Sequence, residues 1–324
     1  MYYFHKCAII HIKEPLPLFV IGKQRMGKRD LKLKIEYHAD DFALFYRQSQ
    51  RILECYHHGR LNGLSILPNS AELHRCLALL PLKTNRDHKL SITIHLNLIE
   101  GKSLCAPEQI PLLVDKSGNL NGSFGNLLLH SFLPDRQAYR AQLRLELAAQ
   151  IRALLPLFQG QPLRLDSHAH YHMIPVVFDA LMDVLHQEQW KVSYIRIPKE
   201  HPTLYLRHWF RLHDIAPINL VKVGILNLLA WRNQRKYRHA LESLDKSIFL
   251  GVFLSGRMYR ENVETLLPDA RALADKAGAF LEILAHPGGI QEPEDIAHLT
   301  NHNDINFLTS PRREKEATLF FPAE

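Results

Sequence analysis

Cysteine is scarce in this 324-residue chain, and its four copies, Cys7, Cys55, Cys76 and Cys105, show no CxxC spacing. A disulfide framework or a thiolate zinc site is normally built from closely spaced pairs, so the sequence argues against both. Scattered cysteines fit a reducing compartment, and we expect a cytoplasmic protein.

Linkers, repeats and long apolar runs are also missing. The chain is 46% hydrophobic and 23% charged, which is typical of globular proteins, and no composition break divides it, so one domain is expected. A short apolar run at residues 15–22 is too short to cross a bilayer and lacks a signal-peptide cleavage site, so we expect no membrane span. The first convincing strand starts at Leu31. We therefore expect an atypical leader, appended or disordered, at residues 1–30 and one domain at residues 31–324.

Acidic residues are outnumbered, and the net charge of +7 is spread along the chain with one denser region at Arg232–Arg238. A basic helix face is most often a solvated face, so we expect no nucleic-acid partner. The stretch Leu220–Arg238 is also apolar at near-helical spacing, which would suit a membrane surface or, as we favour, a helix that covers the sheet. Its apolar residues are Val221, Ile225, Leu228, Leu229 and Trp231.

Strands and helices alternate along the sequence. Residues 31–37 and 90–95 alternate apolar and polar side chains as half-buried strands do. Helices are expected at about residues 45–60, 70–80, 135–155 and 260–277, and a parallel sheet with covering helices follows from this order. Further strands are expected at residues 63–67, 162–167, 192–197, 247–253 and 280–285.

No glycine follows the first strand, where the chain reads Ala-Asp-Asp-Phe-Ala. A doubly wound nucleotide-binding sheet should carry a glycine-rich turn there, so phosphate binding is disfavoured. In a barrel, reactive side chains come from the C-terminal ends of several strands, and the polar clusters of this chain are distributed in that way. The expected fold class is therefore α/β, and a (β/α) barrel with a single domain is favoured over a doubly wound sheet.

Four polar clusters each follow or end an expected strand. An Asp pair, a lone histidine or a His-Pro-Gly turn is by itself most often a cap, a turn or a satisfied core residue. Four such clusters at four strand ends favour a functional site. The clusters are Asp40-Asp41, His95, Asp166-Ser-His168-Ala-His170-Tyr-His172 and His286-Pro-Gly-Gly289.

The third cluster is the most informative one. In extended backbone every second side chain lies on the same face, so Asp166, His168, His170 and His172 would project together. Three imidazoles and a carboxylate on one buried face are costly unless something binds them. The alternative is an exposed polar strand or loop.

One carboxylate and two imidazoles can form a facial site for a divalent ion that acts as a Lewis acid. Asp40 and Asp41 would point to opposite faces inside a strand, but a turn at the strand exit would let both reach one pocket. One of them would bind the metal and the other would act as general base, while a histidine on the opposite wall protonates the leaving amine.

The motifs His-Ala-Asp-Asp-Phe at 38–42, Ile-His-Leu-Asn-Leu at 94–98, Asp-Ser-His-Ala-His-Tyr-His at 166–172 and His-Pro-Gly-Gly at 286–289 resemble the YdjC-like family of carbohydrate deacetylases. The resemblance implies a distorted TIM-like barrel, a divalent metal (magnesium or zinc) and hydrolysis of the N-acetyl group of a chitooligosaccharide or another N-acetylated sugar. It also implies a role for each matching residue. Asp41, His95 and His168 resemble the metal ligands, Asp40 the general base, His286 a catalytic acid, and Asp166, His170 and His172 substrate or outer-shell residues.

Ala43 departs from the family pattern, which usually has glycine after Asp-Asp-Phe. Glycine would permit a positive φ that alanine resists, so a carbohydrate-binding barrel without turnover is the alternative hypothesis. A barrel of the amidohydrolase type is disfavoured because its His-x-His pair typically belongs to the first strand. The glycan stays open between a chitooligosaccharide, a lipid-linked aminosugar and a cell-wall fragment. Homodimers are common among similar proteins, but nothing in this sequence identifies an interface.

Overall fold

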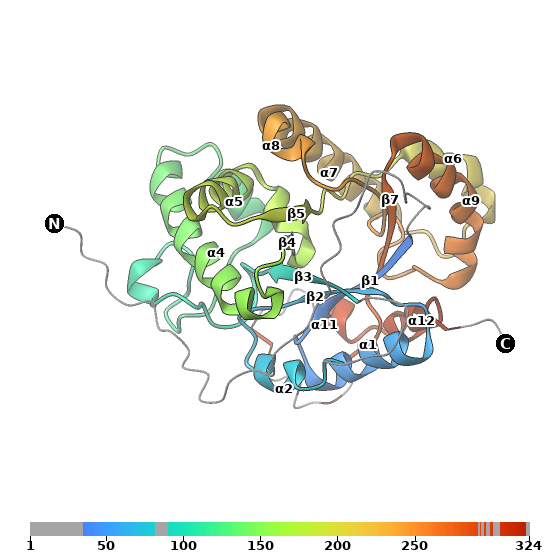
Figure 1. Ribbon diagram of the computed structural model, residues 1–324, viewed down its shortest axis with the longest axis horizontal. Coiled ribbons are helices and arrows are strands. Elements are labelled where there is room, and N and C mark those ends of the chain that lie inside the picture. Colours follow the sequence, from blue (N-terminus) through green and yellow to red (C-terminus); the bar gives the residue numbers. More distant parts are fainter. Residues whose placement is uncertain are drawn as a thin grey trace.

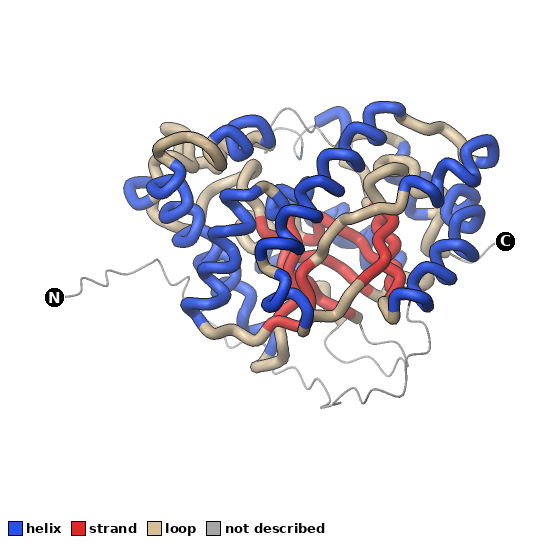
Figure 2. Tube along the Cα trace, turned by 90° about the horizontal axis from the view of Figure 1, so that it is seen from above, coloured by secondary structure: helices blue, strands red, loops and turns tan. Residues whose placement is uncertain are grey.

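The computed structural model describes residues 35–81, 90–290, 292, 295, 299–300 and 305–321. Seven parallel strands form one sheet, and helices pack around its outside (Figures 1 and 2). The expected leader, residues 1–30, lies outside the described residues, and the division into leader and single domain stays a prediction.

The order of elements confirms the expected alternation of strands and helices. The strands are β1 (Ile35–Phe42), β2 (Gly63–Ile66), β3 (Ser91–Leu96), β4 (Leu163–Ser167), β5 (Val192–Ile195), β6 (Ser247–Leu250) and β7 (Phe280–Ala285). The α-helices are α1 (Tyr46–His58), α2 (Leu73–Leu77), α3 (Phe124–Leu129), α4 (Arg136–Phe158), α5 (Pro175–Glu188), α6 (Pro202–His208), α7 (Pro217–Lys236), α8 (Arg238–Glu242), α9 (Arg260–Ala277), α11 (Ile305–Leu308) and α12 (Arg312–Ala317). Short 3₁₀ helices are η1 (Pro107–Gln109), η2 (His168–Met173) and η3 (Trp209–Arg211).

The sheet runs in the order β5-β4-β3-β2-β1-β7-β6, and each neighbouring pair is parallel. It curls until its edges approach, where the amide of Asp245 donates to the carbonyl of Ser193 at 2.8 Å. No ladder joins β5 to β6 in the described part of the chain. The α/β class is confirmed, but the expected TIM-like barrel is an open, curled sheet of seven strands.

The end of β6 differs from the expected strand at 247–253. β6 stops at Leu250 because the next three backbone N–H groups donate to one buried side chain, the carboxylate of Glu200, instead of to a ladder. The N···O distances are 2.6 Å from Gly251, 2.8 Å from Val252 and 2.8 Å from Phe253. A loop that begins at the C-terminal edge of the sheet is fixed in this way.

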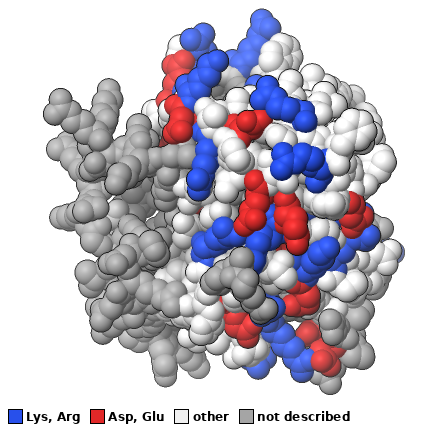
Figure 3. Space-filling view, turned by 90° about the vertical axis from the view of Figure 1, so that its right-hand side faces the viewer, with Lys and Arg blue, Asp and Glu red and all other residues white. Residues whose placement is uncertain are grey.

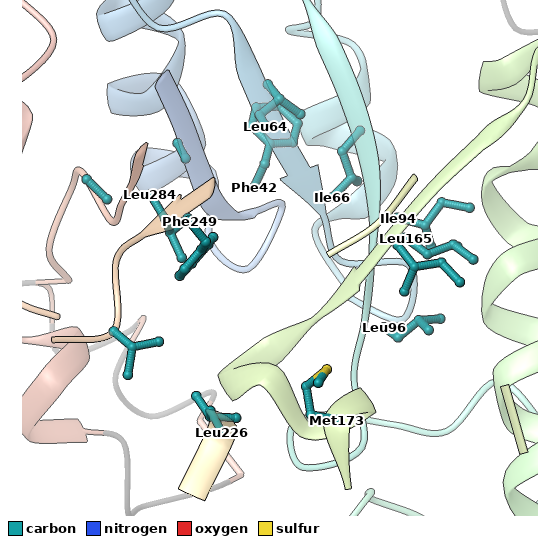
Figure 4. Close-up of a cluster of buried hydrophobic side chains, with 14 of the residues drawn as sticks. Phe42, Leu64, Ile66, Ile94, Leu96, Leu165, Met173, Leu226, Phe249 and Leu284 are labelled. Carbon is teal, nitrogen blue, oxygen red and sulfur yellow. The ribbon is translucent and has the colours of Figure 1, made fainter. Parts of the chain in front are cut away.

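The hydrophobic core lies between the sheet and its helices. Alternate strand residues point outward under α1, α4, α5 and α9, and burial of each large aliphatic side chain stabilises the fold by about 1.5–3 kcal/mol. Figure 4 shows part of this core, which includes the fully buried Phe42, Leu64, Ile66, Ile94, Leu165 and Phe249.

Helix α7 packs against η2 and α5 with a different face from the one its apolar spacing indicated. Of the five apolar residues at near-helical spacing, only Leu229 is buried, because two amide side chains hold another face inward. Asn219 Nδ2 donates to the carbonyl of Phe253 at 3.0 Å, and Asn233 Nδ2 donates to the carbonyl of Met173 at 2.8 Å. A buried amide needs such partners, so these contacts fix the rotation of the helix.

Candidate active site

The exit of β1 places both carboxylates of the first motif on one cavity. The pairing of β1 with β2 shifts register between Ala39 and Phe42, and Asp41 has a left-handed φ of 67°. This turn breaks the alternation of a strand, so Asp40 and Asp41 both line the same pocket. The expectation that a turn brings the two together is confirmed.

The second and third motifs meet through the register of neighbouring strands. His95 on β3 is paired with Asp166 on β4, so the two side chains share a face. His95 Nδ1 donates to Asp166 Oδ1 at 2.7 Å. The other nitrogen, Nε2, is therefore free to face Asp41, whose Oδ1 is 3.4 Å away.

The histidine run after β4 turns instead of continuing as a strand. In η2, Ala169 and His170 have left-handed φ values of 51° and 59°. This turn brings His168 and His170 to the cavity, and His168 Nδ1 lies 2.8 Å from Asp41 Oδ1. Burial, with Arg196 adding to it, holds the pKa of His170 well below its usual value, so its imidazole is neutral near pH 7.

His172 shows that the expected shared face of four residues is wrong. Its Nδ1 lies 2.7 Å from the hydroxyl of Ser167, and its Nε2 donates to the backbone carbonyl of Arg196 at 2.7 Å. Burial lowers the pKa of His172 to about 4, and the residue is not among those that line the cavity. Its contacts support the β4–β5 edge of the sheet.

Asp41, His95 and His168 form a group that fits a metal ion. One oxygen or nitrogen from each lies within 4.8 Å of the others, and all three line the cavity. The buried Nε2 of His95 has no hydrogen-bond partner among the described residues, which is costly unless a further group meets it. A carboxylate with two imidazoles is a donor set for zinc and similar divalent ions.

The charges around the metal-fitting group keep the carboxylate of Asp41 ionised. Burial alone would raise the pKa of Asp41, but the nearby His168, His95 and Arg313 hold it well below the usual range. Burial would also lower the pKa of His95, yet the carboxylates of Asp166 and Asp40 raise it to about 9.

Arg196, just after β5, is the main residue that the sequence analysis did not single out. Its guanidinium is fully buried and contacts Asp40 Oδ2 at 2.8 Å, Asp166 Oδ2 at 2.6 Å and Glu282 Oε1 at 2.8 Å. One cation thus balances three buried carboxylates, which would otherwise be strongly destabilising. A single arginine at a strand end carries no motif, so only the fold identifies it.

The His-Pro-Gly-Gly turn is held by α12. The amide of His286 donates to Glu316 Oε2 at 2.8 Å, and Arg313 Nε donates to the carbonyl of Gly288 at 2.8 Å. Nη2 of Arg313 also donates a hydrogen bond to Asp41 Oδ2 at 3.3 Å. Helix α12 therefore connects the fourth motif to the first, and His286 lines the same cavity as the metal-fitting group.

The cavity has a volume of about 500 Å³ and opens at the C-terminal edge of the sheet. Its wall combines the polar residues above with aromatic and aliphatic side chains, a composition that suits a small ligand with both polar and apolar faces. The apolar part of the wall includes Phe124, Tyr171, Ile225, Leu226, Val252 and Phe307.

Ala43 adopts the conformation that the missing glycine would favour. Its φ is 73°, its amide donates to Ser49 Oγ at 2.9 Å, and its carbonyl accepts a hydrogen bond from Ser70. The turn after β1 is therefore preserved with alanine, at the cost of a strained backbone.

The profile of the YdjC-like protein family matches residues 34–318, and the chain belongs to this family. A carbohydrate deacetylase of Xenopus laevis is 28% identical over 172 residues, which are 53% of this chain and 53% of that protein. A chitooligosaccharide deacetylase of Proteus mirabilis is 28% identical over 255 residues, 79% of this chain and 81% of that protein. The chain spans about half the length of the first curated relatives that it matches.

A solved structure shares the fold. It is a candidate cellobiose-phosphate cleavage protein of Enterococcus faecalis V583, with a TM-score of 0.55 and 16% identity, and the match covers 89% of this chain and 96% of that one. At this identity the likeness concerns the fold alone. None of the described helices combines the length and the apolar character needed to cross a bilayer.

Proposed function

We propose that this protein is a metal-dependent carbohydrate deacetylase that hydrolyses the N-acetyl group of an acetamido sugar. The observation that carries the proposal is the convergence of Asp40, Asp41, His95, His168 and His286 on one cavity of about 500 Å³. The relatives named carbohydrate and chitooligosaccharide deacetylases support the same reaction.

Asp41, His95 and His168 would hold the divalent ion, magnesium or zinc. When bound, such an ion supplies Lewis acidity that polarises the acetamide carbonyl and lowers the pKa of water. Asp166 orients the His95 ring through its 2.7 Å hydrogen bond, a common role of carboxylates behind metal-binding histidines.

Asp40 is the proposed general base. Both of its oxygens lie within 2.9 Å of Arg196 Nη1, which fixes the carboxylate beside the metal group with its charge balanced. It would take a proton from the attacking water, and His286, which lines the same cavity, would protonate the leaving amine. His170 and the aromatic side chains of the wall would contact the sugar.

Acetate release from N,N′-diacetylchitobiose and longer oligomers tests the proposal. We expect release that stops with a chelator and returns when zinc, cobalt, manganese or magnesium is added back. Binding of the sugar without release under every metal would instead support the carbohydrate-binding barrel without turnover. The cytoplasmic location and the homodimer remain predictions.

A further inference from the structure

An apolar stripe runs along the outward face of α7. Ile218, Val221, Ile225 and Leu228 follow one another at intervals of three or four residues, and Trp231 extends the row. Their exposed fractions are high for apolar side chains, at 56% for Val221 and Trp231 and 63% for Leu228. We call these five residues the α7 stripe.

The stripe is unusual for a helix on the surface of a globular protein. Such a helix normally has one apolar face toward the core and a polar face toward water. The inward face of α7 is already filled by Val223, Leu226, Leu229 and Ala230, so the stripe is a second apolar face. A contiguous exposed apolar row of this kind marks a surface that contacts a partner.

The stripe reaches the cavity of the candidate active site. Ile225 belongs to both, and its neighbours Lys222 and Leu226 also line the cavity wall. The position of α7 is fixed near this point because Asn227 exchanges hydrogen bonds with the backbone of Glu200, at 3.0 Å and 2.9 Å. Whatever covers the stripe therefore lies beside the cavity.

The charges of α7 favour an anionic partner. The helix carries Lys222, Arg232, Arg235 and Lys236 and no acidic residue. Arg232 and Lys236 bind the buried carboxylate of Asp179, but Lys222 and Arg235 form no ion pair among the residues that the structure describes. On the face drawn in Figure 3, by contrast, basic and acidic side chains are interleaved.

The positive charge of α7 distinguishes between two partners that could cover the stripe, a second copy of the protein and a lipid surface. A symmetric contact between two copies through α7 would bring like charges together, whereas phosphate headgroups would neutralise them. Apolar residues flanked by Lys and Arg are the pattern of helices that lie in the plane of a membrane surface.

We propose that α7 docks the protein on an anionic lipid surface, with the stripe in the interface and the cavity beside it. The inference about the substrate rests on the proposed function. The acetamido sugar would be carried by a membrane lipid, so that docking brings it to Asp40 and the metal-fitting group.

Vesicle co-sedimentation tests the docking. Wild-type protein should bind vesicles of phosphatidylglycerol and phosphatidylcholine at least tenfold better than pure phosphatidylcholine, and less well as salt is raised. The double variant Val221→Ser with Leu228→Ser should lose about tenfold in binding, because two apolar side chains no longer enter the interface. Leu145→Ser on α4, an apolar residue of 44% exposure, is the matched control and should bind like wild type.

The fluorescence of Trp231 gives an independent readout. Its emission, taken as the difference between wild type and Trp231→Phe, should shift to the blue when the anionic vesicles are added. Absence of vesicle binding by the wild type, or equal binding by the double variant, would overturn the proposal. A dimer that sedimentation detects in the wild type and not in the double variant would assign the stripe to a second copy and also overturn it.

Activity separates the two proposals. The double variant should release acetate from soluble N,N′-diacetylchitobiose at the wild-type rate, but at least tenfold more slowly from an N-acetylglucosaminyl lipid held in anionic vesicles. Vesicle binding without acetate from any substrate would refute the deacetylase and leave the docking intact. An equal rate on the lipid for both proteins would refute the lipid-borne substrate.

Discussion

Asp166 and His95 form a hydrogen bond of 2.7 Å across two neighbouring strands, between Oδ1 and Nδ1. The second oxygen of the same carboxylate lies 2.5 Å from the hydroxyl of Ser65 and 2.6 Å from Arg196 Nη1. Asp166 is therefore fixed from three sides, and it fixes the ring of His95 in turn.

The variant Asp166→Asn should weaken metal binding. Loss of the carboxylate behind a metal-binding histidine typically lowers metal affinity about 10–100-fold, because ring orientation and basicity are lost. Titration calorimetry with Zn²⁺ alone measures this, with circular dichroism to verify the fold. Asp183→Asn is the matched control: it removes a carboxylate on α5 that pairs with Arg140 on α4, and it should bind Zn²⁺ like wild type. Unchanged affinity in Asp166→Asn would disprove the orienting role.

The two carboxylates of the first motif should separate metal binding from turnover. Asp40→Asn should keep the metal and lose at least about 100-fold in acetate release, because the base is removed while the ligands remain. His168→Ala should lose both metal and turnover. Metal content and acetate release, measured on the same preparations, test this pair. Normal release by Asp40→Asn would show that another group is the base.

The variant Ala43→Gly should stabilise the protein. Alanine in the left-handed region is strained by about 1–2 kcal/mol, and part of the gain is offset by the greater freedom of glycine in the unfolded chain. We expect the free energy of unfolding in urea to rise by about 1 kcal/mol. Ala39→Gly, in the regular part of β1, should instead destabilise. A loss of stability in Ala43→Gly would contradict the strain.

Removal of the Arg196 guanidinium should be strongly destabilising. Three buried carboxylates, those of Asp40, Asp166 and Glu282, would lose their shared cation, and such changes typically cost about 3–5 kcal/mol. Arg196→Met should show this loss in urea unfolding, and Arg196→Lys, which keeps the charge but not the planar fork, a smaller one. The exposed pair of Arg238 with Glu242 provides the control, since Arg238→Met should leave stability unchanged within error.

Glu200 should make stability depend on pH. Burial raises its pKa from 4.5 to about 7, although the backbone N–H groups of residues 251–253 lower it in part. The folded protein holds the proton more tightly than the unfolded chain, so this contribution to stability is fully present below pH 4.5 and is lost as the pH rises through about 7. The difference in unfolding free energy between wild type and Glu200→Gln should therefore fall by about 3 kcal/mol over this range. A difference that stays constant from pH 4.5 to pH 8 would refute the shift.

The strand-end residues of the site could be predicted from the sequence. In a parallel sheet the C-terminal ends of all strands share one edge, so motifs that follow strands must converge there. The five residues expected at this edge line one cavity in the structure: Asp40, Asp41, His95, His168 and His286.

Other parts of the site could not be predicted in this way. Periodicity predicts which side chains share a face only within a regular strand or helix. The left-handed turn at Ala169 and His170 ends the extended backbone after β4, and His172 therefore points away from the cavity. Arg196 and Arg313 act through partners far along the chain, which no local pattern records. The rotation of α7 was likewise set by two buried amides and not by its apolar spacing.

The place of β1 in the sheet has a consequence for how the protein is made. β1 pairs with β7 from Ile35 to Ala39, and Asp41 contacts Arg313 across 272 positions of sequence. A ribosome releases the first strand long before either partner is synthesised, so the nascent chain must carry Asp40 and Asp41 without their final neighbours. Contacts of such long range slow folding and leave strand edges open in the meantime. The ion pair between Arg313 and Asp41 therefore forms among the last contacts of the site, only after α12 has left the exit tunnel.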